Sequence, residues 1–560
     1  MPTWDDLSSR DDSIRGFVRE LSADSTTVGL THRDSGASDG YILFAPISSL
    51  PTFLIDTRGR LVHSWLSRYR PAFSCYLLEN GNLLRTAKDY YTQFPGGGYG
   101  GLVEEFDWDD SLTWSYGYSS ETYCQHHDIE PMPNGHVLLI AWELKTRAEA
   151  VAAGRNPNLL VQDVLWPDHL VEVDPAGDSI VWEWHLWDHL IQDFDSSKAN
   201  YGIVADHPEL VDLNFVAAGE RAVADWNHTN SVYYNEQLDQ IVLSVHHFSE
   251  VWVIDHSTTT EEARGHIGGR RGQGGDILYR WGNPQTYRAG TRAGQRFFGQ
   301  HDARWIEPGL PGAGHIMVFN NGYLRPDSNY STVDEFIPAV DSTGHYPRPA
   351  PGAPFGPDTL VWQYRADPPT SFFSGEMSGA HRLPNGNTFI CSSGNGELIE
   401  VTPGAHVVWR YVNPFAGAAP LFQGDSITEN VVFRATQFGP DYPGLAGRSL
   451  APGYPIERYR NPFPGVGETR GAPAGTAGLQ VAPNPCRNDC RFTLPGAAID
   501  GARITLYDAA GRLVRTLPAN GRQVAWNGLD DAGKTARRGV YYCRLQGAGL
   551  SASTKLIKAE

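Results

Sequence analysis

The chain has 560 residues, more than one compact core can hold, because single cores stop growing near ~250–300 residues unless the fold is a closed repeat. Its 45 basic and 64 acidic residues give a formal net charge of −19, which argues against nucleic acid or anionic membrane surfaces as general partners. No apolar run approaches the ~18 residues of a membrane span. Sixty glycines, 38 prolines and an aromatic content of 11% indicate many turns and short strands, and therefore an all-β fold.

Residues 1–40 are expected to form an N-terminal extension. They open with MPTWDDLSSRDDS, which has neither the basic nor the apolar region of a secretory leader. The sequence therefore indicates either a cytoplasmic protein or one whose leader is absent from this sequence.

A short strand pattern recurs between residues 41 and 455. It consists of two apolar or β-branched residues, an aromatic residue, any residue, and then Trp or Tyr. Five of the six copies fit it fully and one has a histidine as its third residue; they lie at 61–65, 112–116, 180–184, 277–281, 360–364 and 407–411. Asn-Gly and similar hairpin signals precede most copies. Six units of short strands, closed radially, predict a six-bladed β-propeller over 41–455; an open solenoid is the alternative, but the sequence shows no terminal caps for one.

The composition changes after about residue 455. Residues 456–478 are rich in Pro, Gly and Ala and are expected to be a linker. Residues 479–560 contain five to seven short strand patterns, which predict a small C-terminal β-sandwich.

Three histidines precede the hairpins of successive repeats at similar spacing. His127 lies seven residues before Asn134, His228 lies seven before Asn235, and His301 takes the corresponding place in the next repeat. Equivalent positions in a propeller share one height and one radius, so we expect these imidazoles to converge on the central channel. Three unrelated buried histidines are the alternative. Further polar side chains lie nearby in the sequence: His126, His246, His247, Asn320, Asn321 and Arg325.

A channel rich in imidazole is compatible with three kinds of chemistry. It could bind a transition metal, bind an anion, or provide a nucleophile and acid–base groups, because histidine titrates near neutral pH. The metal interpretation is the least favoured, since carboxylates at ligand spacing and an HExxH motif are lacking. The sequence therefore predicts no metal and no other cofactor.

Several strings together resemble the bacterial arylsulfate sulfotransferases: DWNHTNSVYYNEQLDQIVLSVHHFSEVWVID, GDILYRWGNPQTY, GQHDARW and RLPNGNTFICSSGNGELIEV. The resemblance covers roughly residues 40–455. It implies a six-bladed propeller that transfers a sulfuryl group from an aryl sulfate donor to a phenolic acceptor without a nucleotide donor. It places the nucleophile at His301 and further catalytic histidines at His228 and His127, with His126 as an alternative to His127.

The chain departs from this family at one position. The family has an arginine eighteen residues after the histidine that corresponds to His228, and here that residue is His246. A guanidinium is always charged and can hold sulfate with two hydrogen bonds, whereas an imidazole is charged only in a suitable environment. We expect His246 to be catalytic, Arg325 to be a candidate for the missing charge, and Asp302 to be a candidate orienter of His301. The substrate-binding set is His126, His247, Asn320, Asn321 and Arg325.

The tail resembles the flagellar-hook-cap-like immunoglobulin domain that serves as a sorting module in type IX secretion. The strings that carry this resemblance are Asn484-Pro485, YDAAGRLVRTL, WNG and GVYY. It implies secretion machinery as a partner, a secreted or cell-surface location with the periplasm as the alternative, and one disulfide among Cys486, Cys490 and Cys543.

Two other classes of function stay open. The propeller could be a non-catalytic structural or binding module that self-associates at the cell surface, or it could be an aryl sulfate hydrolase in which water replaces the phenol.

Overall fold

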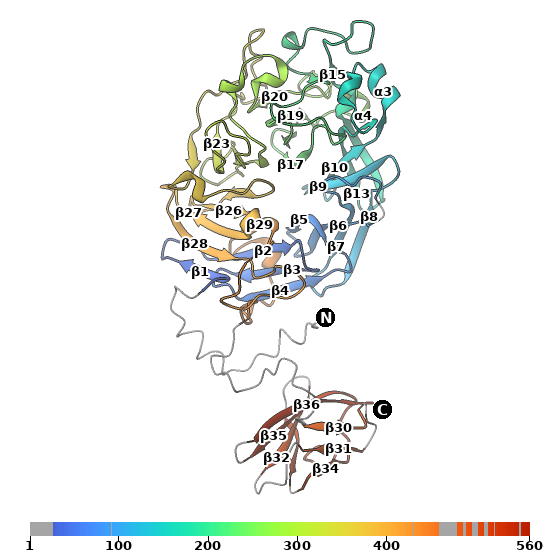
Figure 1. Cartoon of the computed structure of the whole chain (residues 1–560), viewed down its shortest axis with the longest axis vertical. Coiled ribbons are helices and arrows are strands. Elements are labelled where there is room, and N and C mark those ends of the chain that lie inside the picture. The colour runs from blue at the N-terminus through green and yellow to red at the C-terminus, as the bar shows by residue number, and fades with distance from the viewer. Residues whose placement is uncertain are drawn as a thin grey trace. The chain divides into compact units, whose positions relative to one another are not determined.

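The computed structural model describes residues 26–90, 92–427, 429–458, 479–484, 486, 489–494, 502–508, 513–519, 521–547 and 550–559 (Figure 1). The first 25 residues of the expected N-terminal extension, and residues 459–478 of the expected linker, lie outside this part. The chain divides into two compact units, Met1–Arg460 and Asn461–Glu560. Both are built almost entirely of β-strands. None of the helices among the described residues is long and apolar enough to span a membrane.

The described part of the first unit contains six antiparallel sheets of at least four strands. The strands of each sheet are given from the innermost outward. One sheet contains β5 (Pro71–Leu77), β6 (Leu83–Lys88), β7 (Gly101–Phe106) and β8 (Leu112–Gly117), and the next contains β9 (Tyr123–Pro131), β10 (Val137–Glu143), β13 (Asp168–Asp174) and β14 (Ser179–His185). A third contains β17 (Thr229–Asn235), β18 (Gln240–Val245), β19 (Glu250–Asp255) and β20 (Tyr279–Trp281). The other three are β21 (His301–Trp305), β22 (Ile316–Asn320), β23 (Thr332–Phe336) and β24 (Trp362–Tyr364); β25 (Gly379–Arg382), β26 (Thr388–Ser392), β27 (Glu397–Val401), β28 (Val407–Val412) and β1 (Gly29–Arg33); and β29 (Val432–Phe438), β2 (Tyr41–Pro46), β3 (Pro51–Asp56) and β4 (Leu61–Leu66).

Minor elements fill the connections between these sheets. Two short helices, α3 (Arg147–Ala152) and α4 (Thr260–Ala263), each begin with a capping box. Two short strand pairs also lie in these connections: β11 (Lys145–Thr146) pairs with β12 (Val164–Leu165), and β15 (Leu190–Ile191) pairs with β16 (Val211–Asp212). The 3₁₀ turns include η3 (Leu186–Asp188) and η5 (Pro284–Tyr287).

The six sheets follow one another around a centre (Figure 1). Their inner strands are in contact in the cyclic order β29, β5, β9, β17, β21, β25 and back to β29. The order closes because β29, late in the chain, pairs with β2 near its start, with Tyr41 opposite Phe438. The inner strand ends of all six sheets therefore lie near one centre, in agreement with the propeller-like architecture expected from the sequence.

The repeated aromatic motif lies in the fourth strand of each sheet, counted from the innermost strand, and its indoles join neighbouring sheets. The indole N–H groups of five tryptophans donate to the turn of the next sheet: Trp65 to Asp107 O at 2.9 Å, Trp114 to Asp178 Oδ1 at 2.9 Å, Trp182 to Thr258 Oγ1 at 3.2 Å, Trp362 to Pro403 O at 2.8 Å and Trp409 to Thr57 O at 2.8 Å. The motif recurs because each contact between sheets needs a large apolar ring that also has a hydrogen-bond donor.

The second unit contains a three-stranded and a four-stranded sheet among its described residues. The strands, in sheet order, are β30 (Gln480–Ala482), β31 (Cys490–Thr493) and β34 (Gln523–Trp526), and then β33 (Leu513–Pro518), β32 (Arg503–Asp508), β35 (Gly539–Gly547) and β36 (Leu550–Lys558). Phe492 and Trp526 from the first sheet share one buried core with Ile504 and Leu545 from the second.

The cysteines of the second unit do not form the expected disulfide. Cys486, Cys490 and Cys543 are buried free thiols. Burial and the neighbouring Cys486 raise the pKa of the Cys490 thiol, so Cys490 stays protonated near neutral pH. Being buried, the three cysteines act as small apolar side chains of the core.

A buried guanidinium joins alternate sheets at the centre of the first unit. Arg434 on β29 donates from Nη1 to Asp128 Oδ2 on β9 at 2.9 Å, and its Nε lies 3.1 Å from Asp302 Oδ1 on β21. Tyr76 on β5 donates to Asp128 Oδ1 at 2.7 Å, and Arg304 donates to Asp302 Oδ1 at 2.7 Å. The cluster thus balances two buried carboxylates with two guanidinium groups.

Replacing this guanidinium should weaken the first unit. In Arg434→Leu, Asp128 loses the cation that compensates its burial, and breaking a buried ion pair typically costs about 3–5 kcal/mol. We expect the urea midpoint of the first unit, followed by tryptophan fluorescence, to fall accordingly. Arg410→Leu is the matched control, because Arg410 pairs with Glu397 on an exposed surface where such pairs contribute about 0–1 kcal/mol. Equal midpoints for the two variants would contradict the assigned role of Arg434.

Candidate functional site

Five histidine rings lie in a row at the inner strand ends. Successive ring centroids are 5.1, 4.4, 5.2 and 5.2 Å apart in the order His126, His127, His228, His246 and His301. His247 stacks beside His228 at 4.8 Å. The structure therefore brings together every histidine that the sequence singled out, from three neighbouring sheets.

The backbone of the three inner strands is irregular where the histidines lie, and the three histidines do not share one position relative to the strand pairing. Each has a bulge here, and a residue with positive φ lies at or next to the histidine: His127 at 52°, His228 at 53° and Asp302 at 55°. Counted from the first regular pair after the bulge, His127 lies two residues before Ile129, whereas His228 and His301 lie three residues before Ser231 and Arg304. The equal spacing in the sequence thus indicated convergence correctly but not equivalent positions on the strands.

A glycine-rich loop packs directly against His127. The backbone N–H of His127 donates to Gly98 O at 2.8 Å. Gly98 has φ of 93°, and a Cβ there would lie 1.9 Å from His127 Cε1. A side chain at this position would displace the imidazole, so glycine is required for the close approach.

The protonation of His301 is fixed by two contacts. Asn321 donates from Nδ2 to Ser374 O at 2.8 Å and to Met377 O at 2.9 Å, so its Oδ1 faces His301 Nδ1 at 2.9 Å as an acceptor. The backbone N–H of Met377 donates to His301 Nε2 at 3.1 Å. His301 therefore has its proton on Nδ1 and a lone pair on Nε2.

His301 is also held neutral. Burial lowers its pKa to about 3 against the opposing effect of the Asn321 hydrogen bond, and the positive charges of His228 and Arg434 lower it further. A neutral imidazole with an oriented lone pair is the form in which histidine acts as a nucleophile.

The segment that covers His301 Nε2 has an unusual backbone. Met377 and Ser378 have φ of 56° and 83°, which non-glycine residues rarely adopt. Asn321 holds the segment through the carbonyls of Ser374 and Met377, and the backbone N–H of Ser378 donates to Phe433 O at 3.1 Å. One amide side chain thus orients both the imidazole and the N–H group that faces it.

His228 differs from its neighbours because it has a carboxylate partner. Its Nδ1 lies 2.5 Å from Asp225 Oδ2, and Trp142 Nε1 donates to the other oxygen of Asp225 at 2.9 Å. Burial lowers the pKa of His228, but the charge and hydrogen bond of Asp225 outweigh it, so the pKa is raised above its ordinary value. His228 is therefore the member of the row that favours the charged form.

His126 holds His127 in place. His126 Nε2 lies 3.1 Å from Asp168 Oδ1, so this nitrogen donates and His126 Nδ1 accepts from His127 Nδ1 at 2.8 Å. His127 thereby keeps a lone pair on Nε2, beside His228. Both nitrogens of the fully buried His126 are used, so the structure corrects its expected role from substrate contact to positioning of His127.

His246 and His247 line a small pocket with Ser249, Phe298 and Gly299. His246 Nδ1 is buried and has no hydrogen-bond partner within the described residues. Burial and the neighbouring histidines lower the pKa of His246 well below its ordinary value. His247 Nδ1 lies 2.9 Å from the backbone oxygen of Asp225, whereas the buried Nδ1 of His246 has no such partner among the described residues.

Three other residues that the sequence suggested for the site, Asn320, Arg325 and Asp302, form hydrogen bonds with other parts of the protein. Asn320 uses its whole amide on Phe298 N, Arg296 O and Asp334 Oδ2. Arg325 donates to Tyr330 O and Thr332 Oγ1, both at 3.1 Å, instead of to the histidine row. Asp302 accepts from Arg304 and from the backbone N–H of Ala380, so the orienter of His301 is Asn321 and not Asp302.

Sequence reasoning missed two contributors to this site. Asp225 was visible three residues before His228, a spacing that could have suggested the pair. The contact between the backbone N–H of Met377 and His301 could not be predicted from the pattern of side chains, because the turn before β25 brings this N–H group to His301.

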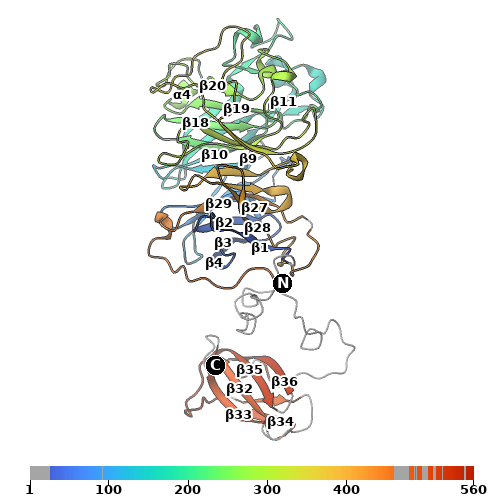
Figure 2. The ribbon, with the colours of Figure 1, turned by 90° about the vertical axis from the view of Figure 1, so that its left-hand side faces the viewer.

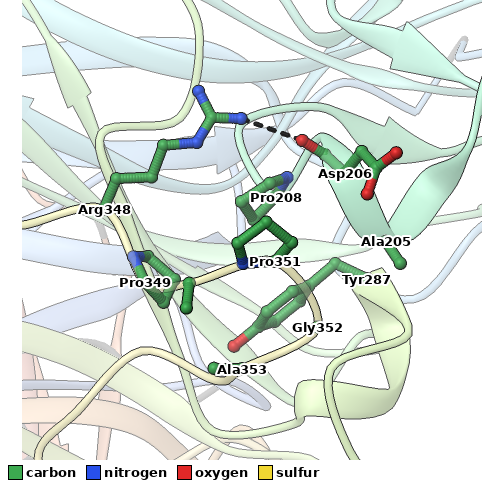
Figure 3. A pocket seen from close by; sticks show the side chains of 10 residues that line it. Ala205, Asp206, Pro208, Tyr287, Arg348, Pro349, Pro351, Gly352 and Ala353 are labelled. Carbon is green, nitrogen blue, oxygen red and sulfur yellow. Dashed lines mark hydrogen bonds between the residues drawn. The ribbon is translucent and has the colours of Figure 1, made fainter.

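Two other features lie outside the histidine row. A cavity of about 270 Å³ is lined by Tyr287, Arg348 and the Pro349–Ala353 segment, where Arg348 donates to Asp206 O (Figure 3). It contains none of the row's histidines. Among the described residues, His189, His266 and Asp276 form a group that could hold a metal ion.

Comparison with solved structures finds only distant similarity. A protein of unknown function from Bacteroides caccae is 10% identical, with a TM-score of 0.39, covering 72% of this chain and 99% of that one. A putative 6-phosphogluconolactonase from Bacteroides fragilis is 10% identical, with a TM-score of 0.34, covering 72% and 99%. A structure described as the Dos1 propeller is 7% identical, with a TM-score of 0.30, covering 72% and 80%. The comparison with curated proteins finds no match.

The comparison with protein families gives a specific result. The model described as "Arylsulfotransferase (ASST)" matches residues 47–345, more than half of the chain. The matched region includes His127, His228, His246 and His301. The chain therefore belongs to the arylsulfotransferase family.

Proposed function

We propose that this protein transfers a sulfuryl group from an aryl sulfate ester to a phenol through a sulfohistidine at His301, without a nucleotide donor. Family membership supports the reaction class. The observation that carries the mechanism is the state of His301: neutral, protonated on Nδ1 toward Asn321, and with an Nε2 lone pair that accepts from the backbone N–H of Met377.

In the first half of the proposed reaction, His301 Nε2 attacks the sulfur atom of the donor. The N–S bond forms as the bond between sulfur and the aryl oxygen breaks. His228 in its charged form gives its proton to the leaving phenoxide, because its Nδ1 is engaged by Asp225 and its Nε2 is the nitrogen that remains for the substrate. His246 Nδ1 supplies a hydrogen bond to a sulfuryl oxygen.

In the second half, the acceptor phenol gives its proton to the now neutral His228. Its oxygen attacks the sulfur atom, the N–S bond breaks, and His301 regains its lone pair. His127, with its own lone pair beside His228, provides an alternative place for the proton during the exchange of phenols.

The Met377 N–H group must leave Nε2 before attack. It lies at hydrogen-bond distance from the reacting nitrogen, so a small outward shift would let it donate to a sulfuryl oxygen in its place. The positive φ values of Met377 and Ser378 fit a segment that is held under strain at the site.

Larger-scale features of the chain are proposals as well. We infer that the six sheets are the blades of a six-bladed propeller, supported by the cyclic order of the inner strands. We also propose that residues 479–560 form an immunoglobulin-like sandwich that serves secretion or surface attachment, supported by two sheets around one core.

Loss of His301 should abolish transfer. We expect His301→Ala to lower the rate of aryl sulfate turnover by at least about 10³-fold, because the variant lacks the nitrogen that takes the sulfuryl group in the proposed mechanism. Turnover of a chromogenic aryl sulfate with added phenol measures this. In the wild type, a quenched reaction without acceptor should leave one sulfuryl group on the peptide that contains His301.

The matched control is His345→Ala, since His345 is an exposed histidine of the same unit and should keep full activity. Thermal midpoints of both variants show whether either has lost its fold. Unchanged turnover in a folded His301→Ala protein would reject the mechanism. Sulfate release that does not depend on phenol would instead identify a hydrolase.

The pH dependence should report the His228–Asp225 pair. Asp225 raises the pKa of His228, so kcat/KM for the donor should fall as pH rises through that raised pKa. In Asp225→Asn the raising charge is lost and burial remains, so the alkaline limb should move to lower pH. His301, with a pKa of about 3, should cause no acid limb above about pH 4. An alkaline limb at the same pH in both proteins would contradict the assignment of His228 as the acid.

A further inference from the structure

Away from the histidine row, three ligand-type side chains meet at the outer edges of two neighbouring sheets. His189 follows η3 and the outer strand β14, whereas His266 and Asp276 lie in the connection between α4 and the outer strand β20. Both ribbon views show α4 and β20 toward the same end of the unit (Figures 1 and 2). The three side chains thus lie where these two neighbouring sheets meet at their outer edges.

One carboxylate oxygen serves both imidazoles. Asp276 Oδ1 lies 2.8 Å from His189 Nδ1 and 2.8 Å from His266 Nδ1. The three ligand atoms all lie within 4.8 Å of one another. Asp276 and His189 are buried, and among the described residues the ion pairs of Asp276 are with these two histidines.

The second nitrogen of His189 determines what the first one can be. His189 Nε2 lies 2.9 Å from Ala263 O, and a carbonyl oxygen only accepts, so Nε2 has the proton. In the neutral ring Nδ1 then presents a lone pair to a carboxylate oxygen at 2.8 Å. A cation bound by both atoms satisfies this contact, and so does a further proton on the imidazole or on the carboxyl group.

A metal ion satisfies this arrangement. Metal-binding histidines usually donate their other N–H to a carbonyl or carboxylate, which fixes the tautomer, as Ala263 O does here. Two imidazole nitrogens and one carboxylate oxygen suit Zn²⁺, whose bonds to such ligands are about 2.0–2.2 Å, whereas Ca²⁺ and Mg²⁺ prefer oxygen alone. Water would complete a tetrahedral set on the side of His266, whose side chain is 60% exposed.

The loop that contains His266 and Asp276 is closed by a backbone hydrogen bond and approaches His189 closely. Gly275 N donates to Gly265 O at 3.0 Å, which brings the ends of the loop together although His266 and Asp276 are ten residues apart. A Cβ on Gly275 would lie 2.7 Å from His189 Nε2 and 2.0 Å from Ala263 O. Glycine is therefore needed for the loop to approach the histidine.

We propose that His189, His266 and Asp276 bind one Zn²⁺ ion, which fastens the 264–276 loop to the neighbouring sheet. The site is structural, and it is independent of the sulfotransfer proposed above.

A local readout is needed because the histidine row could also bind zinc. The loop contains the exposed Arg264 and Arg270, at which trypsin cuts once the loop opens. For the full chain, zinc at about ten times its dissociation constant should slow cleavage at these two sites by about tenfold, because the ion binds only the closed loop. His266→Ala should remove this protection and reduce the zinc content found by elemental analysis by one ion per chain.

His207→Ala is the matched control, since His207 is an exposed histidine that pairs with Glu209 and should keep the protection. Asp276→Asn provides a second variant, expected to lose protection like His266→Ala. Cleavage that zinc does not slow in the wild type, or slows equally in His266→Ala, would overturn the proposal and leave a proton between His189 and Asp276 as the explanation of the contact.

Discussion

The first unit depends on charge compensation at its centre. Arg434 comes from the strand that closes the ring, and its two carboxylate partners come from β9 and β21, so one guanidinium joins every second sheet. The same contacts fix the strand ends on which His127 and His301 lie. Arg434 also contributes to the low pKa of His301, so the group that holds the sheets together helps to keep the proposed nucleophile neutral.

The backbone around the histidines is the second requirement for this geometry. Regular strands would alternate their side chains between two faces, and adjacent residues could not all reach one centre. Bulges and positive φ values at His127, His228 and Asp302 redirect the side chains, at an expected cost of about 1–3 kcal/mol each. The surrounding contacts, such as Gly98 O with His127 N, stabilise these conformations.

Sequence patterns predicted the strands and the meeting of the histidines because both depend on local spacing. The aromatic motif marks an outer strand wherever an indole must reach the next sheet, and hairpin signals mark the inner ones. The partners of the histidines were less accessible. Asn321 directly follows β22, and Met377 precedes β25 of the next sheet, so both reach His301 through turns whose path no local pattern encodes. The Asp302 assignment failed because the bulge turns that side chain toward two arginines. The group of His189, His266 and Asp276 was not predicted either, because His189 is far from the other two residues in the sequence and no local spacing encodes their approach.

The resemblance implies an arginine where this chain has His246, and the proposed mechanism places the positive charge of the site elsewhere. Arg434 is occupied by Asp128 and Asp302, and Arg325 by its own loop, so neither guanidinium takes over the role. The charge instead lies on His228, where Asp225 maintains it. A guanidinium would keep its charge throughout a reaction, whereas His228 loses its charge when it protonates the departing phenoxide. On the proposed mechanism the sulfuryl group then lies among neutral imidazoles, which hold it less tightly than an arginine would. Such a site favours onward transfer to an acceptor over accumulation of the sulfohistidine.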